Sequence, residues 1–294
     1  MHRILVPLDG SALAEASLPV ARTLAGATGA GLLLLHVLEA SPPGAVHGQR
    51  HLGSVPEARD YLEALARGLA SIPVEVHVHE EGIQDAGKSI GEHAEELQSD
   101  LVVIATHGIH RFDRIFKGNA AQRALSFGGV PVLTVPAGAG IDAMRWKNLI
   151  VTTDGRDGHR PPLAWLGALA TSLRLDVELL LVVDTSASLT GDTKAIARSM
   201  PASMALALEA AVAESAVWLQ GLAASGELEG LSVRTDILRG RPDSALARRQ
   251  GSRSEDLIVL STHGRIGFGS IWEGSMAARM LSRLKCAALL VRAE

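Results

Sequence analysis

Aromatic residues are scarce in this 294-residue chain, which has four tryptophans, one tyrosine and four phenylalanines. So few rings cannot supply the platforms on which single-stranded nucleic acids stack. A basic excess is also missing, since the formal net charge is −4 and the isoelectric point is near 6.3. The chain therefore lacks the electrostatic footprint of a DNA- or RNA-binding protein, and we expect no nucleic-acid partner.

Cysteine and long hydrophobic runs are nearly absent as well. The lone cysteine, Cys286, excludes an internal disulfide framework and suits a reducing compartment. The longest apolar run covers residues 31–38 and is interrupted by His36, which is far short of a membrane span. Because the chain opens directly on the strand-like segment Met1–Asp9, we expect no signal peptide. These observations predict a soluble, cytoplasmic protein with no membrane partner.

Aliphatic residues, by contrast, are abundant, and they are arranged as a repeat. Hydrophobic residues make up 47% of the chain, and its length predicts about two domains. The segment Ile4–Gly10 matches Leu149–Gly155, and Leu34–Val37 matches Leu179–Val182 at the same spacing. The sequence therefore indicates a gene duplication, with the small and flexible segment Ala137–Asp142 as the linker.

Each half alternates strands with helices. In the first half we expect strands at 3–8, 31–38, 74–79, 101–106 and 130–135, and helices at 12–26, 56–70, 86–98 and 118–127. Such a pattern is typical of the α/β class, in which helices cover both faces of a parallel sheet. We predict two tandem domains with five parallel strands each, at residues 1–138 and 146–294. The second half is longer by a segment near residues 185–199. We expect the Ala/Leu-rich stretch 202–224 to be an ordinary packed helix, with a partner surface as the alternative.

The tripeptide Thr-His-Gly occurs twice, each time directly after an apolar strand and nine residues before another glycine. The two copies lie within Ala105–Asn119 and Ser261–Ser275. A glycine loop that leads from a strand to a helix can present backbone N–H groups to a phosphate. Since parallel strands place their carboxyl ends on one rim, Asp9 and the first loop are expected to meet there. The sequence thus predicts one pocket per half.

These motifs resemble the universal stress protein family, and the pair resembles its tandem members. The resemblance rests on Ile4–Ser11, Leu34–Val37, Thr106–Gly108 and Pro131–Val135 and extends over essentially the whole chain. It implies two flavodoxin-like (adenine nucleotide α-hydrolase-like) domains. It also implies binding of ATP, with Mg²⁺, through a Gly-x2-Gly-x9-Gly-Ser/Thr loop. It also implies a role in stress adaptation or signalling through the bound nucleotide.

The resemblance assigns candidate nucleotide-binding residues in both halves. In the second half they are Asp154 at the nucleoside, Val182 at the adenine, and Ser261, Gly264, Gly274 and Ser275 at the phosphates. The first-half counterparts are Asp9, Val37, Ala105, Gly108, Gly118 and Asn119. Ala105 and Asn119 replace a glycine and a hydroxyl of the family loop, whereas the second half departs only at Ser261. We therefore favour the second half as the ATP site. Asp9 has an alternative role, since an Asp before Gly initiates a turn and caps the next helix.

Catalytic and metal-binding motifs give no assignment. The chain has no Walker lysine loop and no His-Glu-x2-His helix, and no residue is placed as a general base, so at most slow ATP hydrolysis is expected. His77 and His79 lie two residues apart on the same face of one strand, and we interpret them as part of a solvated face.

An alternative function is a dimerisation or interaction scaffold of the same fold that binds no nucleotide. Ala105, Ser261 and Asn119 favour that alternative, because they depart from the family loop. The closing strand of each half would leave an exposed sheet edge, and exposed edges associate. Single-domain relatives dimerise through those edges. We therefore predict an intramolecular pseudo-dimer and leave further homodimerisation open.

Overall fold

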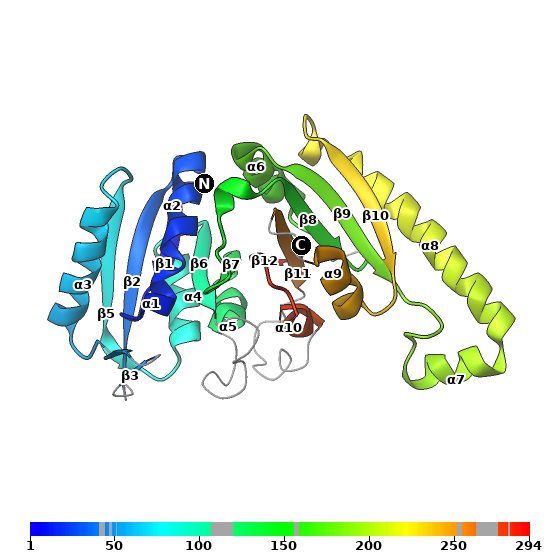
Figure 1. Ribbon diagram of the computed structural model, residues 1–294, viewed down its shortest axis with the longest axis horizontal. Coiled ribbons are helices and arrows are strands. Elements are labelled where there is room, and N and C mark those ends of the chain that lie inside the picture. Colours follow the sequence, from blue (N-terminus) through cyan, green and yellow to red (C-terminus); the bar gives the residue numbers. More distant parts are fainter. Residues whose placement is uncertain are drawn as a thin grey trace.

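The computed structural model describes residues 1–40, 45–46, 49–50, 52–106, 120–155, 159–251, 255–262, 276–281 and 283–294. Ten strands in this part of the chain form one continuous sheet with helices on both faces (Figure 1). These strands are β1 (Arg3–Pro7), β2 (Gly31–Glu39), β5 (Val74–Ile83), β6 (Leu101–Thr106), β7 (Val132–Pro136), β8 (Asn148–Thr153), β9 (Asp176–Val183), β10 (Val233–Arg239), β11 (Asp256–Thr262) and β12 (Ala288–Arg292). Two short strands, β3 (Ala45–Val46) and β4 (Gln49–Arg50), pair separately.

The helices cover both faces of this sheet. They are α1 (Ala12–Glu15), α2 (Leu18–Thr28), α3 (Val55–Gly68), α4 (Ala86–Glu96), α5 (Ala120–Gly128), α6 (Leu163–Leu173), α7 (Gly191–Ser199), α8 (Pro201–Ala223), α9 (Pro242–Gln250) and α10 (Met276–Leu281), with short 3₁₀ helices η1 (Ala143–Arg145) and η2 (Gly226–Leu228). One hydrophobic core lies under α2, α3, α6 and α8, and the other lies under α4, α5, α9 and α10. Both cores run through the two halves of the chain.

The strand order places the same two strands at the centre of each half. The order is β10-β9-β8-β11-β12-β7-β6-β1-β2-β5, so that β1 lies beside β6 and β8 lies beside β11. Within each half, all pairings of this ten-stranded sheet are parallel. The chain therefore winds in opposite directions on the two sides of β1 and of β8. In open α/β sheets, ligands bind at such a switch point, outside the carboxyl ends of the strands.

The two halves join through their closing strands. β12 pairs with β7 in the antiparallel direction, with Leu289 opposite Leu133. The Thr134 hydroxyl donates a hydrogen bond of 2.9 Å to the Ala288 carbonyl oxygen. These closing strands, which would be exposed edges in an isolated half, are thus covered within one molecule, and the outermost strands of the sheet are β5 and β10.

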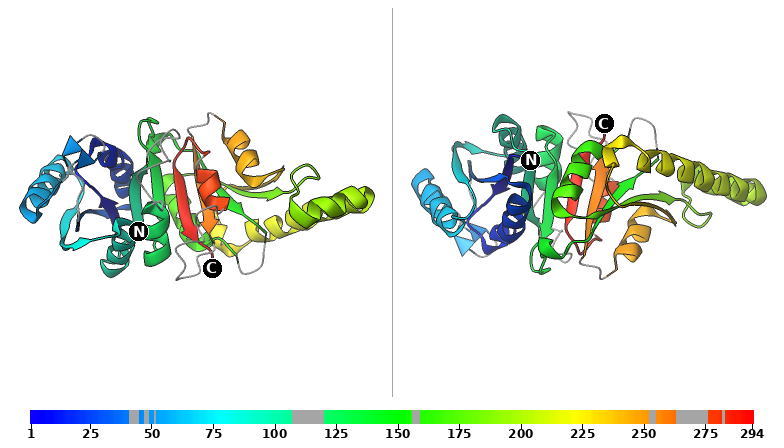
Figure 2. Two further views of the ribbon diagram at one scale, coloured as in Figure 1. Left: turned by 90° about the horizontal axis from the view of Figure 1, so that it is seen from below. Right: turned by 90° about the horizontal axis from the view of Figure 1, so that it is seen from above.

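Two helical predictions need correction. The single helix expected over residues 12–26 is two helices, α1 and α2, because the Ser17 hydroxyl donates to the Ala14 carbonyl oxygen at 2.6 Å and Pro19 starts a new helix. The stretch expected to be an ordinary packed helix is α8, of which only Leu219 and Leu222 are buried. Figure 2 shows α8 extending beyond the rest of the molecule along its longest axis.

Candidate functional site

The carboxyl ends of the central strands hold half of the residues that the sequence assigns to nucleotide binding. Asp9, Val37 and Ala105 lie at the ends of β1, β2 and β6 in the first half. Asp154, Val182 and Ser261 lie at the ends of β8, β9 and β11 in the second. The remaining predicted residues, Gly108, Gly118, Asn119, Gly264, Gly274 and Ser275, lie outside the described residues.

In the first half, Asp9 is engaged in the turn that follows β1. Its Oδ1 accepts hydrogen bonds from the backbone nitrogen and the hydroxyl of Ser11, at 2.9 and 2.6 Å. The Ser11 hydroxyl in turn caps α1 by accepting from the Ala14 backbone nitrogen at 3.1 Å. Gly10 between them has φ +87°, and a Cβ there would lie 2.9 Å from the buried side chain of Leu52. Asp9 therefore makes the contacts expected of its alternative role, which is to form the turn and support the helix cap.

The corresponding turn in the second half is more open. Asp154 is exposed, and its Oδ2 lies 3.0 Å from Nδ1 of His159. Gly155 has φ +71°, a backbone conformation that favours glycine, and a Cβ there would press on the terminal methyl group of Leu181. The half-buried Val182 follows Leu181 on β9, which pairs with β8.

Ser261 is the most unusual polar group at this edge. Its hydroxyl oxygen is buried and forms no hydrogen bond within the part of the chain that the structure describes. Ala105 occupies the same place on β6, where no hydroxyl has to be satisfied. A buried polar atom without a partner costs about 1–3 kcal/mol, so it points to a polar group that completes the site.

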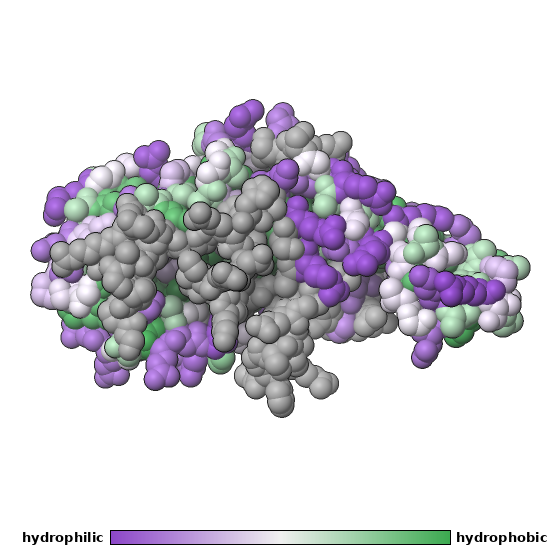
Figure 3. Space-filling view, turned by 60° about the horizontal axis from the view of Figure 1, so that its bottom comes forward, coloured by the Kyte–Doolittle hydropathy of each residue, from purple (hydrophilic) through white to green (hydrophobic). Residues whose placement is uncertain are grey.

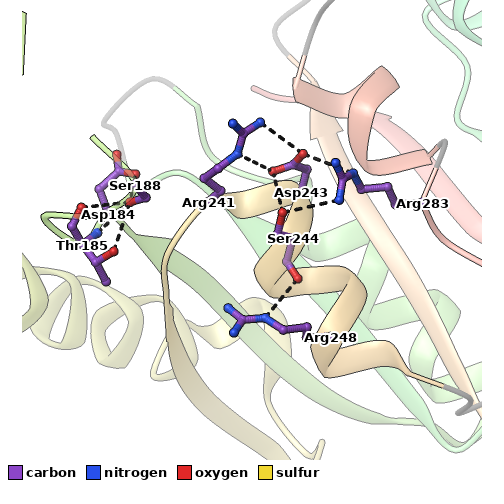
Figure 4. Close-up of polar contacts among 8 residues, drawn as sticks. All are labelled: Asp184, Thr185, Ser188, Arg241, Asp243, Ser244, Arg248 and Arg283. Atoms are coloured by element: carbon purple, nitrogen blue, oxygen red, sulfur yellow. Dashed lines mark hydrogen bonds and ion pairs between the residues drawn. The ribbon is translucent and has the colours of Figure 1, made fainter. Parts of the chain in front are cut away.

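Two arginines contact one buried carboxylate at the same edge of the second half, and a third arginine lies on the same helix (Figure 4). Asp243, at the start of α9, is 1% exposed and lies 3.3 Å from Nε of both Arg241 and Arg283. Burial alone would raise the pKa of Asp243, but the hydrogen bond and charge of Arg241 and the charge of Arg283 hold it below its usual value. Arg248 donates to the Ser244 carbonyl oxygen at 3.4 Å. The two guanidinium groups on one carboxylate give the start of α9 a positive balance.

The loop after β9 faces this arginine group in Figure 4. The Ser188 hydroxyl donates to Asp184 Oδ1 at 2.7 Å and accepts from the Thr185 backbone nitrogen at 2.8 Å. These contacts fix the loop close to the carboxyl end of β9. Sequence reasoning missed both groups, because their members come from separate elements and no spacing connects them.

The first half has a smaller version of the arginine group. Asp85 caps α4 by accepting from the Lys88 backbone nitrogen at 3.1 Å, and it also pairs with Arg123 from α5. Among the described residues, one arginine contacts Asp85, whereas two arginines contact Asp243.

The histidines on β5 do not form the solvated face that the sequence predicts. The rings of His77 and His79 pack against the buried His93 of α4, with centroids 5.4 and 4.7 Å away. Burial, followed by the nearby His93 and His79, lowers the pKa of His77. The described residues contain no group of three or more histidine, cysteine or carboxylate side chains arranged to hold a metal ion.

Helix α4 contains a residue spacing that is typical of a catalytic serine. Gly87-Lys-Ser89-Ile-Gly91 has the spacing of a nucleophile elbow, but it lies inside α4 and not at a turn from strand to helix. A Cβ at Gly91 would lie 2.4 Å from the Ala124 carbonyl oxygen, so the glycine allows α4 and α5 to pack closely. Nδ1 of His93 donates to the Ser89 carbonyl oxygen at 2.8 Å and is not available as a base for the Ser89 hydroxyl.

Comparison with known proteins decides the family. A model of the universal stress protein family matches residues 1–136 and again 145–292. The chain belongs to the universal stress protein family. It is 26% identical over 149 residues to a universal stress protein of Methanocaldococcus jannaschii, covering 50% of this chain and 82% of the relative. A relative from Thermus aquaticus is 30% identical over 134 residues, covering 45% of this chain and 96% of the relative.

Solved structures confirm the fold of both universal stress protein domains together. A putative universal stress protein from Pseudomonas aeruginosa superposes with a TM-score of 0.65 at 16% identity, covering 100% of this chain and 94% of that one. One from Archaeoglobus fulgidus gives the same TM-score at 16% identity and covers 99% and 98% of the two chains. The predicted α/β class and the tandem arrangement are therefore confirmed.

Proposed function

We propose that the second domain of this tandem universal stress protein binds ATP together with Mg²⁺. The observation that carries the proposal is the buried Ser261 hydroxyl, which lies at the switch point of the second half without a partner among the described residues. A phosphate oxygen or ribose hydroxyl at the carboxyl end of β11 would satisfy it. Asp154 and Val182, at the ends of β8 and β9, would then line the nucleoside side of the same site.

The charge balance of this edge supports a polyphosphate ligand. Arg241 and Arg283 share the Asp243 carboxylate at the start of α9, and Arg248, from the last turn of that helix, donates to the Ser244 carbonyl oxygen. Guanidinium groups are well suited to phosphate, and helix N-termini favour anions. Ser275, by its place in the family loop, would supply a hydroxyl near a bound Mg²⁺, with Gly264 and Gly274 allowing the backbone to approach the phosphates.

Calorimetric titration with ATP and MgCl₂ tests this proposal. We expect one site per chain, with Gly274→Ala and Ser275→Ala abolishing the heat of binding and Gly118→Ala leaving it unchanged. The last variant is the matched control, because it makes the same glycine substitution in the other domain. Binding that is lost in Gly118→Ala and kept in Gly274→Ala would assign the site to the first domain. The absence of any binding would contradict the proposal altogether.

The nucleotide would serve cytoplasmic stress adaptation or signalling, with the two domains acting as an intramolecular pseudo-dimer. The pairing of β7 with β12 supports the second part of this proposal. A scaffold that binds no nucleotide is the second candidate function. Leu52, packed over the turn at Gly10, and Ala105 in place of a glycine favour it for the first domain. The scaffold would be supported by two results together. ATP would give no heat of binding, and the protein would still restore full stress resistance to a strain from which its gene is deleted.

A further inference from the structure

Helix α8 is far more exposed than its composition predicts. It is 23 residues long with a mean hydropathy of 1.4 over its most apolar window, of which only 6% is buried. α7 before it has no buried residue. Figure 3 shows weakly polar and apolar side chains reaching the surface at the end of the molecule where Figure 1 places these two helices.

The two faces of α8 have different surroundings. Leu219 and Leu222 are buried, and Ala211, Val212 and Trp218 pack against the same core beneath β9 and β10. At 3.6 residues per turn, the opposite face consists of four residues that we call the outer stripe: Leu206, Ala210, Ala213 and Val217. Leu206 is 74% exposed and Val217 is 70% exposed. Ile196 and Met200, just before α8, are also exposed large apolar residues.

The equivalent helix of the first domain shows what an ordinary surface helix looks like. α3 buries Ala58 and Leu62, and its exposed positions include Arg59, Asp60 and Glu63. The outer stripe of α8 has no charged residue. A helix that is apolar on all sides is normally covered, and a contiguous exposed apolar patch marks an interaction surface.

The charges around α8 favour a second copy of this chain as the cover. Lys194 and Arg198 of α7 lie before its first turn, whereas the exposed Glu229 lies just after its last. Glu227 nearby is already paired with Arg160 of the same chain at 2.5 Å. An antiparallel pair of α8 helices brings the basic end of each copy to the acidic end of the other and opposes the two helix dipoles. Arg239 of β10 donates a hydrogen bond of 2.6 Å to Glu209, so the charge of Glu209 is balanced within the same chain.

A lipid surface fits these charges less well. Helices that lie on membranes carry lysine and arginine on their polar face, which attracts anionic headgroups. The charged residues within α8 are Glu209 and Glu214. Glu209 is paired with Arg239, and the carboxylate of Glu214 would be repelled by such a surface.

We propose that α8 pairs antiparallel with α8 of a second copy along the outer stripe, forming an isologous homodimer. In this register Ala210 lies opposite Ala213 of the second copy, and Leu206 lies opposite Val217. The helix is ~35 Å long and ~10 Å wide, so it would cover on the order of 350 Å² of each copy. Interfaces of this size belong to weak, concentration-dependent complexes. The dimer is independent of nucleotide binding, because the stripe lies away from the carboxyl ends of β8 and β11.

Sedimentation velocity without nucleotide, over a range of protein concentrations, tests this interface. We expect the wild type to pass from monomer to dimer as concentration rises, and Ala213→Glu to weaken dimerisation at least tenfold. Ala64→Glu is the matched control, since it makes the same change at an exposed position of α3 and should leave dimerisation unchanged. A wild type that stays monomeric at every concentration, or an equal effect of the two variants, would overturn the proposal.

Cysteine cross-linking tests the register. Ala210→Cys should give a covalent dimer on mild oxidation, whereas Ala64→Cys should stay monomeric. The chain's own Cys286 does not interfere, because burial raises the pKa of its thiol to about 12. Equal cross-linking of both variants would contradict the proposed pairing. Binding of monomeric wild type to phosphatidylcholine vesicles that Ala213→Glu abolishes would overturn the proposal in favour of a lipid surface.

Discussion

The two domains share one strand order but end their central strands in different ways. In the first, Asp9 is engaged with Ser11 and a leucine covers the turn that follows. In the second, the exposed Asp154 lies beside His159, and Ser261 buries a hydroxyl with no partner among the described residues. The sheet core is retained in both copies, while the carboxyl edge has diverged. Duplication thus preserved the residues that fold each domain and left the ligand-facing residues free to change.

The largest expected effect compares the two helices that follow the second strand of each domain. Leu62 of α3 and Leu219 of α8 are both fully buried. Each substitution to alanine should lower the free energy of unfolding by about 2–5 kcal/mol, because it leaves a cavity in the core. Leu206→Ala, on the exposed part of α8, should change it by less than ~0.5 kcal/mol. Urea titration of dilute protein measures all three, and an equal loss at Leu206 and Leu219 would show that the outer stripe is packed within the monomer.

The next effect separates the two arginine groups. Arg241→Gln should weaken binding of ATP and Mg²⁺ about tenfold, since a charged hydrogen bond contributes about 1.5–3 kcal/mol and Arg241 is half exposed. Arg123→Gln removes the equivalent charge from the first domain and should leave the affinity unchanged. Calorimetric titration at two salt concentrations checks both variants. A similar loss in each would show that the arginines act only through stability.

The junction between the domains offers a smaller effect. Thr134→Val removes the hydroxyl that bonds the Ala288 carbonyl oxygen and keeps the shape of the side chain. We expect a loss of about 1 kcal/mol in the free energy of unfolding, which is the usual net contribution of one hydrogen bond. Chemical denaturation followed by both fluorescence and circular dichroism measures it. An unchanged midpoint would mean that this bond does not stabilise the junction.

The smallest effect is a pH dependence confined to the first domain. The pKa of His77 is lower in the folded protein, so the folded state binds a proton less readily than the unfolded chain. The stability that neutral His77 contributes is fully present above the ordinary histidine pKa near 6.5, and it should fall as the pH drops below that value. Because His77 is partly exposed, we expect at most about 1 kcal/mol. Thermal unfolding of His77→Asn between pH 5 and 8 should show a weaker dependence than the wild type, and an identical dependence would exclude His77 as its source.

Local patterns predicted most of the sheet, because strands such as β6 and β11 are continuous apolar runs that must be buried. They could not predict the surroundings of α8, since an Ala/Leu-rich helix has the same composition whether it lies in a core or on a surface. Nor could they place His93 against His77, a contact made by the packing of α4 on β5. The arginine group could not be predicted for the same reason, because Arg241 and Arg283 come from different elements. Of the predicted site residues, those at strand ends lie where expected, and the loop glycines stay a prediction.

The antiparallel pairing of β7 with β12 also has a consequence for biosynthesis. The first domain leaves the ribosome with its closing strand complete but uncovered, and β12 is made after every other strand of the sheet. Until then β7 presents open backbone donors and acceptors to any nearby chain. The nascent first domain is therefore the form of this protein most in need of a chaperone.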